Sequence, residues 1–444
     1  MSAPIFRDNP DYAESVRLLI RLHKLFCEGK GESVQADEIR EATEPLWWKL
    51  AEIERERIDN MAADLSTLEP DSAFTHPEVV EVDASEFWKQ VGPLRREGRF
   101  TQVLGSLRKM PECVAAQRAT VLRALSYEQL GEHEIALVFF EAAARFEKEG
   151  DAATTLFLSK LFNYQRRKEA VRLASALAEN PEPLSIELSL FAADILGILT
   201  SRQEDKASVP NLRQAQSLFS SAIEKIEKWP ENPQAKFWLN HSYKGIALCH
   251  YQLDNQAETI RFLDRAIATD STDHEALTLR GLMCDSAQVD DAIAYFRRAT
   301  EMRSPDVWPY LFLAFDALVN GRYSECLNWC ALALTRSRDR EILAELHEWI
   351  AISLAETGTH HDRVREMFQR ALLLSPANER VVHNFDAFEN ALAGKKAVTP
   401  RWDVQKDIET HEALAFMSGR VQTSYVDAST SGGGPTSATV VAVN

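Results

Sequence analysis

The sequence predicts an all-α protein built from repeated pairs of helices. Small and large apolar residues recur four and three positions apart on one helical face, as Ala292, Phe296 and Ala299 do. Each such helix follows another helix that carries a small residue near its middle, such as Gly281. Because one helix pair cannot bury its apolar face alone, we expect the pairs to stack against one another.

Residues 1–82 form an acidic segment before the repeats, with 18 acidic and 9 basic residues. We expect two helices in it. The first directs an apolar face, made of Val16, Leu19, Ile20 and Leu22, toward a partner surface. The second, within 36–65, carries Leu46, Trp47, Leu50 and Ile53, with a break or kink at Pro45 near its start. Trp47, Trp48 and Trp88 are expected at the junction with the first repeat.

The repeats occupy residues 84–393, where we expect eight units and a capping helix. The units lie near 84–112, 117–150, 151–183, 184–231, 236–271, 273–305, 306–339 and 340–378. The apolar face recurs as Ala136, Phe140 and Ala143, as Ala215, Phe219 and Ala222, and as Val364, Phe368 and Ala371. The preceding helices place Ala124, Ala314 and Ala351 at the position of Gly281. In the seventh unit, Cys326 and Cys330 fill the apolar positions, so we expect them in the core and not at a metal.

The last helix and the tail complete the predicted organisation. In the capping helix, Val382, Phe385, Phe388 and Leu392 share one side. Residues 394–444 end in a Ser/Thr/Gly-rich stretch that predicts a flexible, largely disordered tail, with one short helix at 402–416.

The repeat period resembles that of a known family. Ala266, Ala299 and Ala333 follow one another at 33 and 34 residues. This spacing, with small residues where the paired helices meet, resembles the tetratricopeptide repeat, a 34-residue helix-turn-helix unit. The resemblance covers 84–393, although the step from Ala333 to Ala371 is 38 residues and the family's signature tryptophan is replaced. It implies a right-handed superhelical solenoid whose first helices line a concave groove that binds peptides or extended segments.

The family's period also implies which side chains face that groove. One unit would present Trp308, Leu311, Phe315 and Leu318 as an exposed apolar strip. The flanking first helices would add Lys244, Tyr251 and Leu282, and an acidic rim of Glu275, Asp285, Glu345 and Glu348. The matching ligand is an amphipathic helix or extended segment with apolar anchors and basic flanks. Two alternatives stay open: the strip is part of the core, or the C-terminal tail covers it.

Some family members bind acidic chain ends through a two-carboxylate clamp, which this sequence does not predict. Lys244 occupies one clamp position, but Leu248 stands where an asparagine is needed. Trp308 and Phe312 replace the cations that the clamp requires.

These features predict a protein-interaction scaffold and no enzyme. No GxGxxG, GxxxxGK[ST] or GxSxG motif is present, and none of the four His-Glu pairs is followed by a second histidine with zinc-site spacing. The segments outside the repeats are shorter than a usual catalytic domain. We therefore expect no cofactor and no metal. The alternative function is self-assembly, in which a neighbouring copy's N-terminal helices or tail fill the groove.

The charge and the cysteines limit the partners and the compartment. The net charge of -17 disfavours nucleic acid and acidic membranes as partners. The six cysteines show no CxxC spacing, and the sequence contains no signal peptide and no apolar run of 18 residues. We therefore expect a cytoplasmic protein whose partner is another protein or a second copy of itself.

Overall fold

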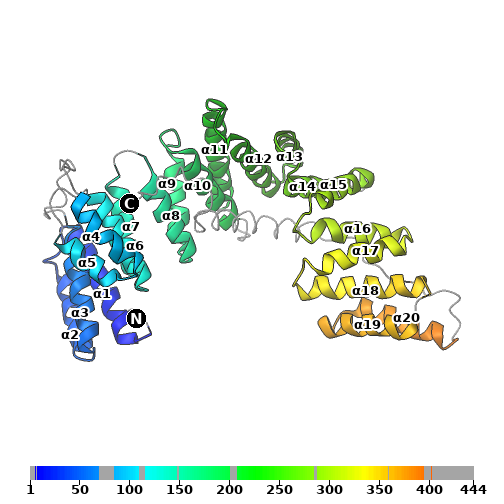
Figure 1. Ribbon diagram of the computed structural model, residues 1–444, viewed down its shortest axis with the longest axis horizontal. Coiled ribbons are helices and arrows are strands. Elements are labelled where there is room, and N and C mark those ends of the chain that lie inside the picture. The colour runs from blue at the N-terminus through cyan, green and yellow to red at the C-terminus, as the bar shows by residue number, and fades with distance from the viewer. Residues whose placement is uncertain are drawn as a thin grey trace. The chain divides into compact units, whose positions relative to one another are not determined.

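The computed structural model (Figure 1) describes residues 6, 8–69, 85–109, 116–147, 150–200, 208–284, 288–358, 360–394 and 402. Within these residues all regular secondary structure is helical, in twenty α-helices, which confirms the predicted all-α fold. The helices fall into two compact units that divide at residue 200, inside the fourth expected repeat. Cys113, Asp285, the linker after residue 69 and the tail with its short helix lie outside the described residues, apart from Gly394 and Trp402.

The N-terminal segment forms three helices, where we expected two. They are α1 (Pro10–Cys27), α2 (Val34–Trp47) and α3 (Glu52–Ser66). Helix α2 continues through Pro45, so the interruption comes later, at 48–51. The side chain of Glu54 accepts a 2.8 Å hydrogen bond from the Ala51 amide, which starts α3 there.

Helices α1 and α3 pack directly on the repeats that follow. The next helices of this unit are α4 (Ser85–Arg96), α5 (Phe100–Arg108), α6 (Ala116–Gln129), α7 (His133–Arg145), α8 (Ala152–Asn163), α9 (Arg167–Ala178) and α10 (Ile186–Thr200). Tyr12 of α1 and Met61 of α3 share one buried apolar cluster with Tyr127 of α6 and Phe139 of α7. The apolar face of the N-terminal helices is therefore covered by this chain's own repeats.

The second unit is a series of stacked helices, and Figure 1 shows α16, α17 and α18 one after another, followed by α19 and α20 together. Its members are α11 (Ser208–Glu227), α12 (Ala235–Gln252), α13 (Gln256–Thr269), α14 (His274–Leu282), α15 (Val289–Glu301), α16 (Trp308–Val319), α17 (Tyr323–Leu334), α18 (Arg340–Glu356), α19 (His361–Leu374) and α20 (Glu379–Leu392). From α11 onward, each helix packs against the next in the chain.

Close approach between paired helices explains the small residues. A Cβ atom on Gly281 of α14 would lie 2.6 Å from the ring of Phe296 on α15. A Cβ atom on Gly245 of α12 would lie 2.2 Å from the ring of Phe219 on α11. Ala124, at the equivalent position of α6, is fully buried. The predicted close-packing position is therefore confirmed.

The predicted apolar face is also confirmed. Its aromatic members Phe140, Phe219, Phe296 and Phe368 are all buried. In the seventh pair, Cys326 and Cys330 are buried as expected, with their sulfur atoms 3.8 Å apart. The two thiols thus occupy the positions that an alanine and a phenylalanine hold in pairs such as Ala292 and Phe296.

The capping helix α20 packs with a different face from the expected one. Val381, Asn384 and Phe388 are buried, whereas Val382 and Leu392 are exposed, so the prediction for these last two residues is wrong. The reason is polar: the Asn384 amide donates a 2.7 Å hydrogen bond to Glu348 of α18. This buried hydrogen bond holds Asn384 on the inner face of α20.

Candidate protein-interaction surfaces

The predicted groove strip on α16 is mostly interior. Trp308 is only 3% exposed, and Leu311 and Leu318 are also buried, so the prediction of an exposed strip is wrong for these three residues. They belong to a large apolar cluster that includes residues from α12 to α20. Helix α16 packs on α15, α17 and also α18, which covers it on several sides. Phe315 is half-buried, with its ring 5.6 Å from that of Trp349 on α18.

Lys244, the expected groove cation, is paired within the chain. Its Nζ lies 2.8 Å from Asp273 Oδ2 and also contacts the carboxylate of Glu275. Burial lowers the pKa of Lys244, but attraction to Glu275 and Asp273 is stronger, and the net pKa is raised. The ammonium group is thus permanently charged and already neutralised. This pairing further disfavours a role for Lys244 in clamping a ligand carboxylate.

Glu348, expected in the acidic rim, is buried and bound to the capping helix. One of its oxygens lies 2.6 Å from Arg380 Nη2, and the other accepts the hydrogen bond from Asn384. Burial raises the pKa of Glu348, while Arg380 and Asn384 act in the opposite direction. Arg380 also pairs with Glu345 at 3.2 Å. These carboxylates therefore join α18 to α20.

The remaining predicted site residues divide between core and surface. Leu282 is buried at the end of α14. Tyr251 and Phe315 keep part of their rings exposed, and Glu275 and Glu345 keep part of their carboxylates exposed. Consecutive first helices are connected by Lys244 with Glu275, by Phe315 with Trp349, and by Glu348 with Arg380. We call this face of α12, α14, α16 and α18 the wall, and Tyr251 and Phe315 are the predicted site residues whose rings stay half-exposed on it.

One polar cluster has the composition of a hydrolase triad but lacks its geometry. The hydroxyl oxygen of buried Ser304 lies 3.4 Å from His274 Nδ1, and Asp306 Oδ2 lies 3.7 Å from the same nitrogen. A triad needs the serine and the carboxylate on opposite ring nitrogens, so that the histidine can accept one proton while the other is held. Here Ser304 donates a hydrogen bond to Asp306 instead. The arrangement ties α14 to the turn before α16.

Two features are absent from the described part of the chain. No group of three or more His, Cys, Asp and Glu side chains there is arranged to hold a metal ion. None of the helices in those residues is both long and apolar enough to cross a membrane.

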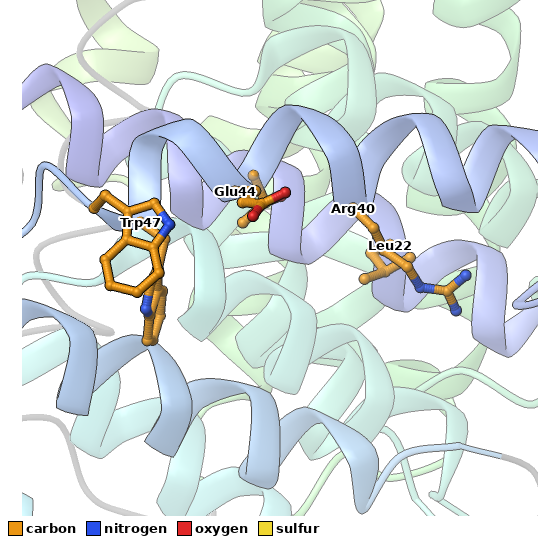
Figure 2. A pocket seen from close by; sticks show the side chains of 6 residues that line it. Leu22, Arg40, Glu44 and Trp47 are labelled. Atoms are coloured by element: carbon orange, nitrogen blue, oxygen red, sulfur yellow. The ribbon is translucent and has the colours of Figure 1, made fainter.

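A surface pocket that the sequence reasoning missed lies between α1 and α2 (Figure 2). It has a volume of about 290 Å³ and is lined by Leu22, Arg40, Thr43, Glu44, Trp47 and Trp48. Trp47 packs partly against the N-terminal core cluster, as a junction residue should. Trp48 is 71% exposed, so its expected place in the junction is wrong. Adjacent helical residues point about 100° apart, and the narrow buried face of α2 accommodates only one of the two rings.

Comparisons with known proteins find similar proteins among solved structures. No protein-family model and no curated protein matches this chain. Among solved structures, it is similar to YrrB, described as a TPR protein with an unusual peptide-binding site, at 16% identity and a TM-score of 0.34, covering 48% of this chain and 96% of YrrB.

Two further structures show the same level of likeness. A tetratricopeptide repeat protein from Parabacteroides merdae matches at 15% identity and a TM-score of 0.37, covering 61% of this chain and 98% of that one. Yeast Tom70 matches at 13% identity and a TM-score of 0.32, covering 93% and 77% of the two chains. TM-scores below 0.5 do not establish a common fold, so the description of this chain as stacked helix pairs rests on its own helix contacts.

Proposed function

We propose that this chain is a protein-interaction scaffold that binds a peptide or helical segment along the first helices of its second unit. The observation that supports this proposal is a wall of α12, α14, α16 and α18 held by side-chain contacts. These contacts join α12 to α14, α14 to the turn before α16, and α16 to α18. Such a wall offers a stiff, extended surface, which suits a chain segment better than a small molecule.

The exposed groups on this wall define the ligand. Among the predicted site residues, Tyr251 and Phe315 have half-exposed rings, so apolar anchors on the ligand would contact them. Glu275 and Glu345 are paired with Lys244 and Arg380, and basic flanks on the ligand would have to compete with these cations. We therefore expect the rings to supply most of the binding free energy and the carboxylates to supply orientation.

The competing proposal is self-assembly, in which either the N-terminal helices or the tail would bind a neighbouring copy. Donation of the N-terminal helices to a neighbour would separate Tyr12 and Met61 from the cluster that buries them. That cost disfavours these helices as donors. The start of the tail contacts its own unit: the Trp402 indole donates a 2.6 Å hydrogen bond to Glu356, and its ring lies 6.2 Å from that of Phe368. A tail that fills a neighbour's groove remains the form of self-assembly to test.

The test compares variants of the full chain in affinity capture from native lysate. Tyr251→Ala combined with Phe315→Ala removes the two half-exposed rings of the predicted site. Leu332→Ala combined with Leu373→Ala is the control, since these two side chains are exposed on α17 and α19, outside the wall. We expect the first pair to lose the specifically captured partners and the control to keep them, with equal helicity by circular dichroism. Retention of every partner by the first pair would refute the wall as the binding site.

A further inference from the structure

We propose that the outer face of α2, with Leu22 of α1 at its pocket, is a second docking surface, and that its partner is a basic amphipathic helix of another protein with a large apolar anchor. The anchor fills the pocket beside Trp48, and the basic side chains lie along α2. This surface is formed by residues of the first unit and is independent of the wall proposed above.

The pocket supplies the anchor point. Leu22 of α1 and the rings of Trp47 and Trp48 give it apolar walls, and its volume of about 290 Å³ is near the lower end of the range for ligand pockets. Figure 2 shows Trp47, Glu44 and Arg40 along α2, with Leu22 beside Arg40. A large ring left 71% exposed at a pocket is typical of an interaction anchor, because covering it removes apolar area from water.

The length of the face points to a helix as the occupant. Val34 starts α2 and is 75% exposed, and it shares the outward side of this helix with Trp48 fourteen positions later. At 1.5 Å per residue, about 21 Å separates them along the helix axis, close to four helical turns. A partner helix of that length would contact apolar groups at both ends.

The charged residues between Val34 and Trp48 determine the charge that we expect on the partner. Glu38, Glu41 and Glu44 are exposed on α2 between Val34 and Trp48, and no cation of the described residues pairs with them. Glu41, Glu44 and Trp48 follow at three and four positions, so they form one stripe. The Arg40 guanidinium donates hydrogen bonds to Asp37 Oδ1 at 2.6 Å and to the carbonyl oxygen of Gly31 at 2.7 Å. The row therefore favours lysine and arginine on the partner and repels an anionic membrane.

The charges also argue against a segment of this same chain as the occupant. The linker 70–84 contains four acidic residues and no lysine or arginine, so α2 would repel it. The basic stretch at 395–401 leads into Trp402, whose indole is bonded to Glu356 and packs on the second unit's core. A helix from a different protein is the occupant that the charge of α2 favours.

The experiment uses fluorescence anisotropy with the full chain and two synthetic 18-residue amphipathic peptides as probes. Both carry leucine and tryptophan on one face; one has lysine flanks and the other has glutamate flanks. We expect the lysine peptide to bind at least tenfold more tightly, with the difference shrinking as salt rises. Trp48→Ala should weaken its binding about tenfold or more, and Glu41→Lys with Glu44→Lys should reverse the preference between the peptides.

The matched control is Glu231→Lys with Glu301→Lys, which makes the same charge change at exposed positions of the second unit. It should leave both affinities within about twofold, apart from a uniform effect of net charge. Absence of lysine-peptide binding, equal binding by Trp48→Ala, or equal affinity for the two peptides would overturn the proposal. So would light scattering that shows a dimer which Trp48→Ala converts to monomer, since the occupant would then be a second copy.

Discussion

The hydroxyl group of Tyr127 on α6 donates a 2.6 Å hydrogen bond to the fully buried carboxylate of Asp64 on α3. Arg108 binds the same carboxylate through two nitrogens, at 2.9 and 3.0 Å, and the guanidinium of buried Arg123 lies 3.7 Å away. One carboxylate thus joins α3 to α5 and α6. The N-terminal helices and the first repeats are held together by charge as well as by apolar contact.

We predict that Asp64→Asn strongly destabilises the first unit. The substitution leaves Arg123 buried beside a neutral amide, and breaking a buried ion pair on one side costs about 3–5 kcal/mol. Urea unfolding followed by circular dichroism measures the loss. Asp59→Asn, at an exposed position of the same helix, is the control and should change stability by less than about 0.5 kcal/mol. Equal effects of both substitutions would contradict the role of Asp64.

His23 should make folding of the first unit dependent on pH. Burial, helped by Arg145 and Lys24, lowers the pKa of His23 from 6.5 to about 4. The unfolded chain therefore binds a proton between pH 6.5 and 4 that the folded chain excludes, and stability falls as pH decreases through that window. We expect a loss of about 1–3 kcal/mol, measured as urea midpoints at pH 7 and pH 4.5. His23→Gln should reduce that difference, and an unchanged difference would refute the assignment.

Gly281→Ala should destabilise the second unit. The added methyl group would lie 2.6 Å from the buried ring of Phe296, and overpacking of this kind costs about 1–3 kcal/mol. Gly105→Ala is the matched control, because Gly105 is also helical but has no atom within 4 Å of the new methyl group. The control should be neutral or stabilising, since alanine favours helix by about 1 kcal/mol over glycine. Thermal unfolding of both variants tests the contrast.

Trp308→Ala should destabilise the second unit, because Trp308 is a core residue. Removal of a buried tryptophan typically costs about 3–5 kcal/mol. Trp229→Ala, at a position that is 57% exposed, should change the free energy of unfolding by less than about 0.5 kcal/mol. If Trp308→Ala leaves the unfolding transition unchanged, this side chain does not belong to the core.

The sequence predicted those features that depend on one helix pair. The period of Ala292, Phe296 and Ala299 identifies an inward face, and Gly281 identifies the point of closest approach, because both follow from helical geometry. The exposure of Trp308 was not predictable in this way. It depends on how closely the next helix pair stacks. Contacts between successive pairs, such as the ion pair of Lys244 with Asp273, do not follow from the period within one pair. The face that α20 buries likewise depends on the hydrogen bond from Asn384 to Glu348, which the apolar period of the sequence does not reveal.

The buried thiols of the seventh helix pair provide a built-in reporter of local opening. Cys326 and Cys330 are fully buried, so a thiol-reactive reagent can reach them only when α17 separates from its neighbours. The other four cysteines would be replaced first: Cys27, Cys113 and Cys284 by serine, and buried Cys249 by alanine. When closing is faster than labelling, the labelling rate of the remaining pair divided by the rate of an exposed thiol gives the opening free energy at this position of the stack. Repeating the measurement with a bound partner would show whether binding on the neighbouring helices stiffens the seventh pair.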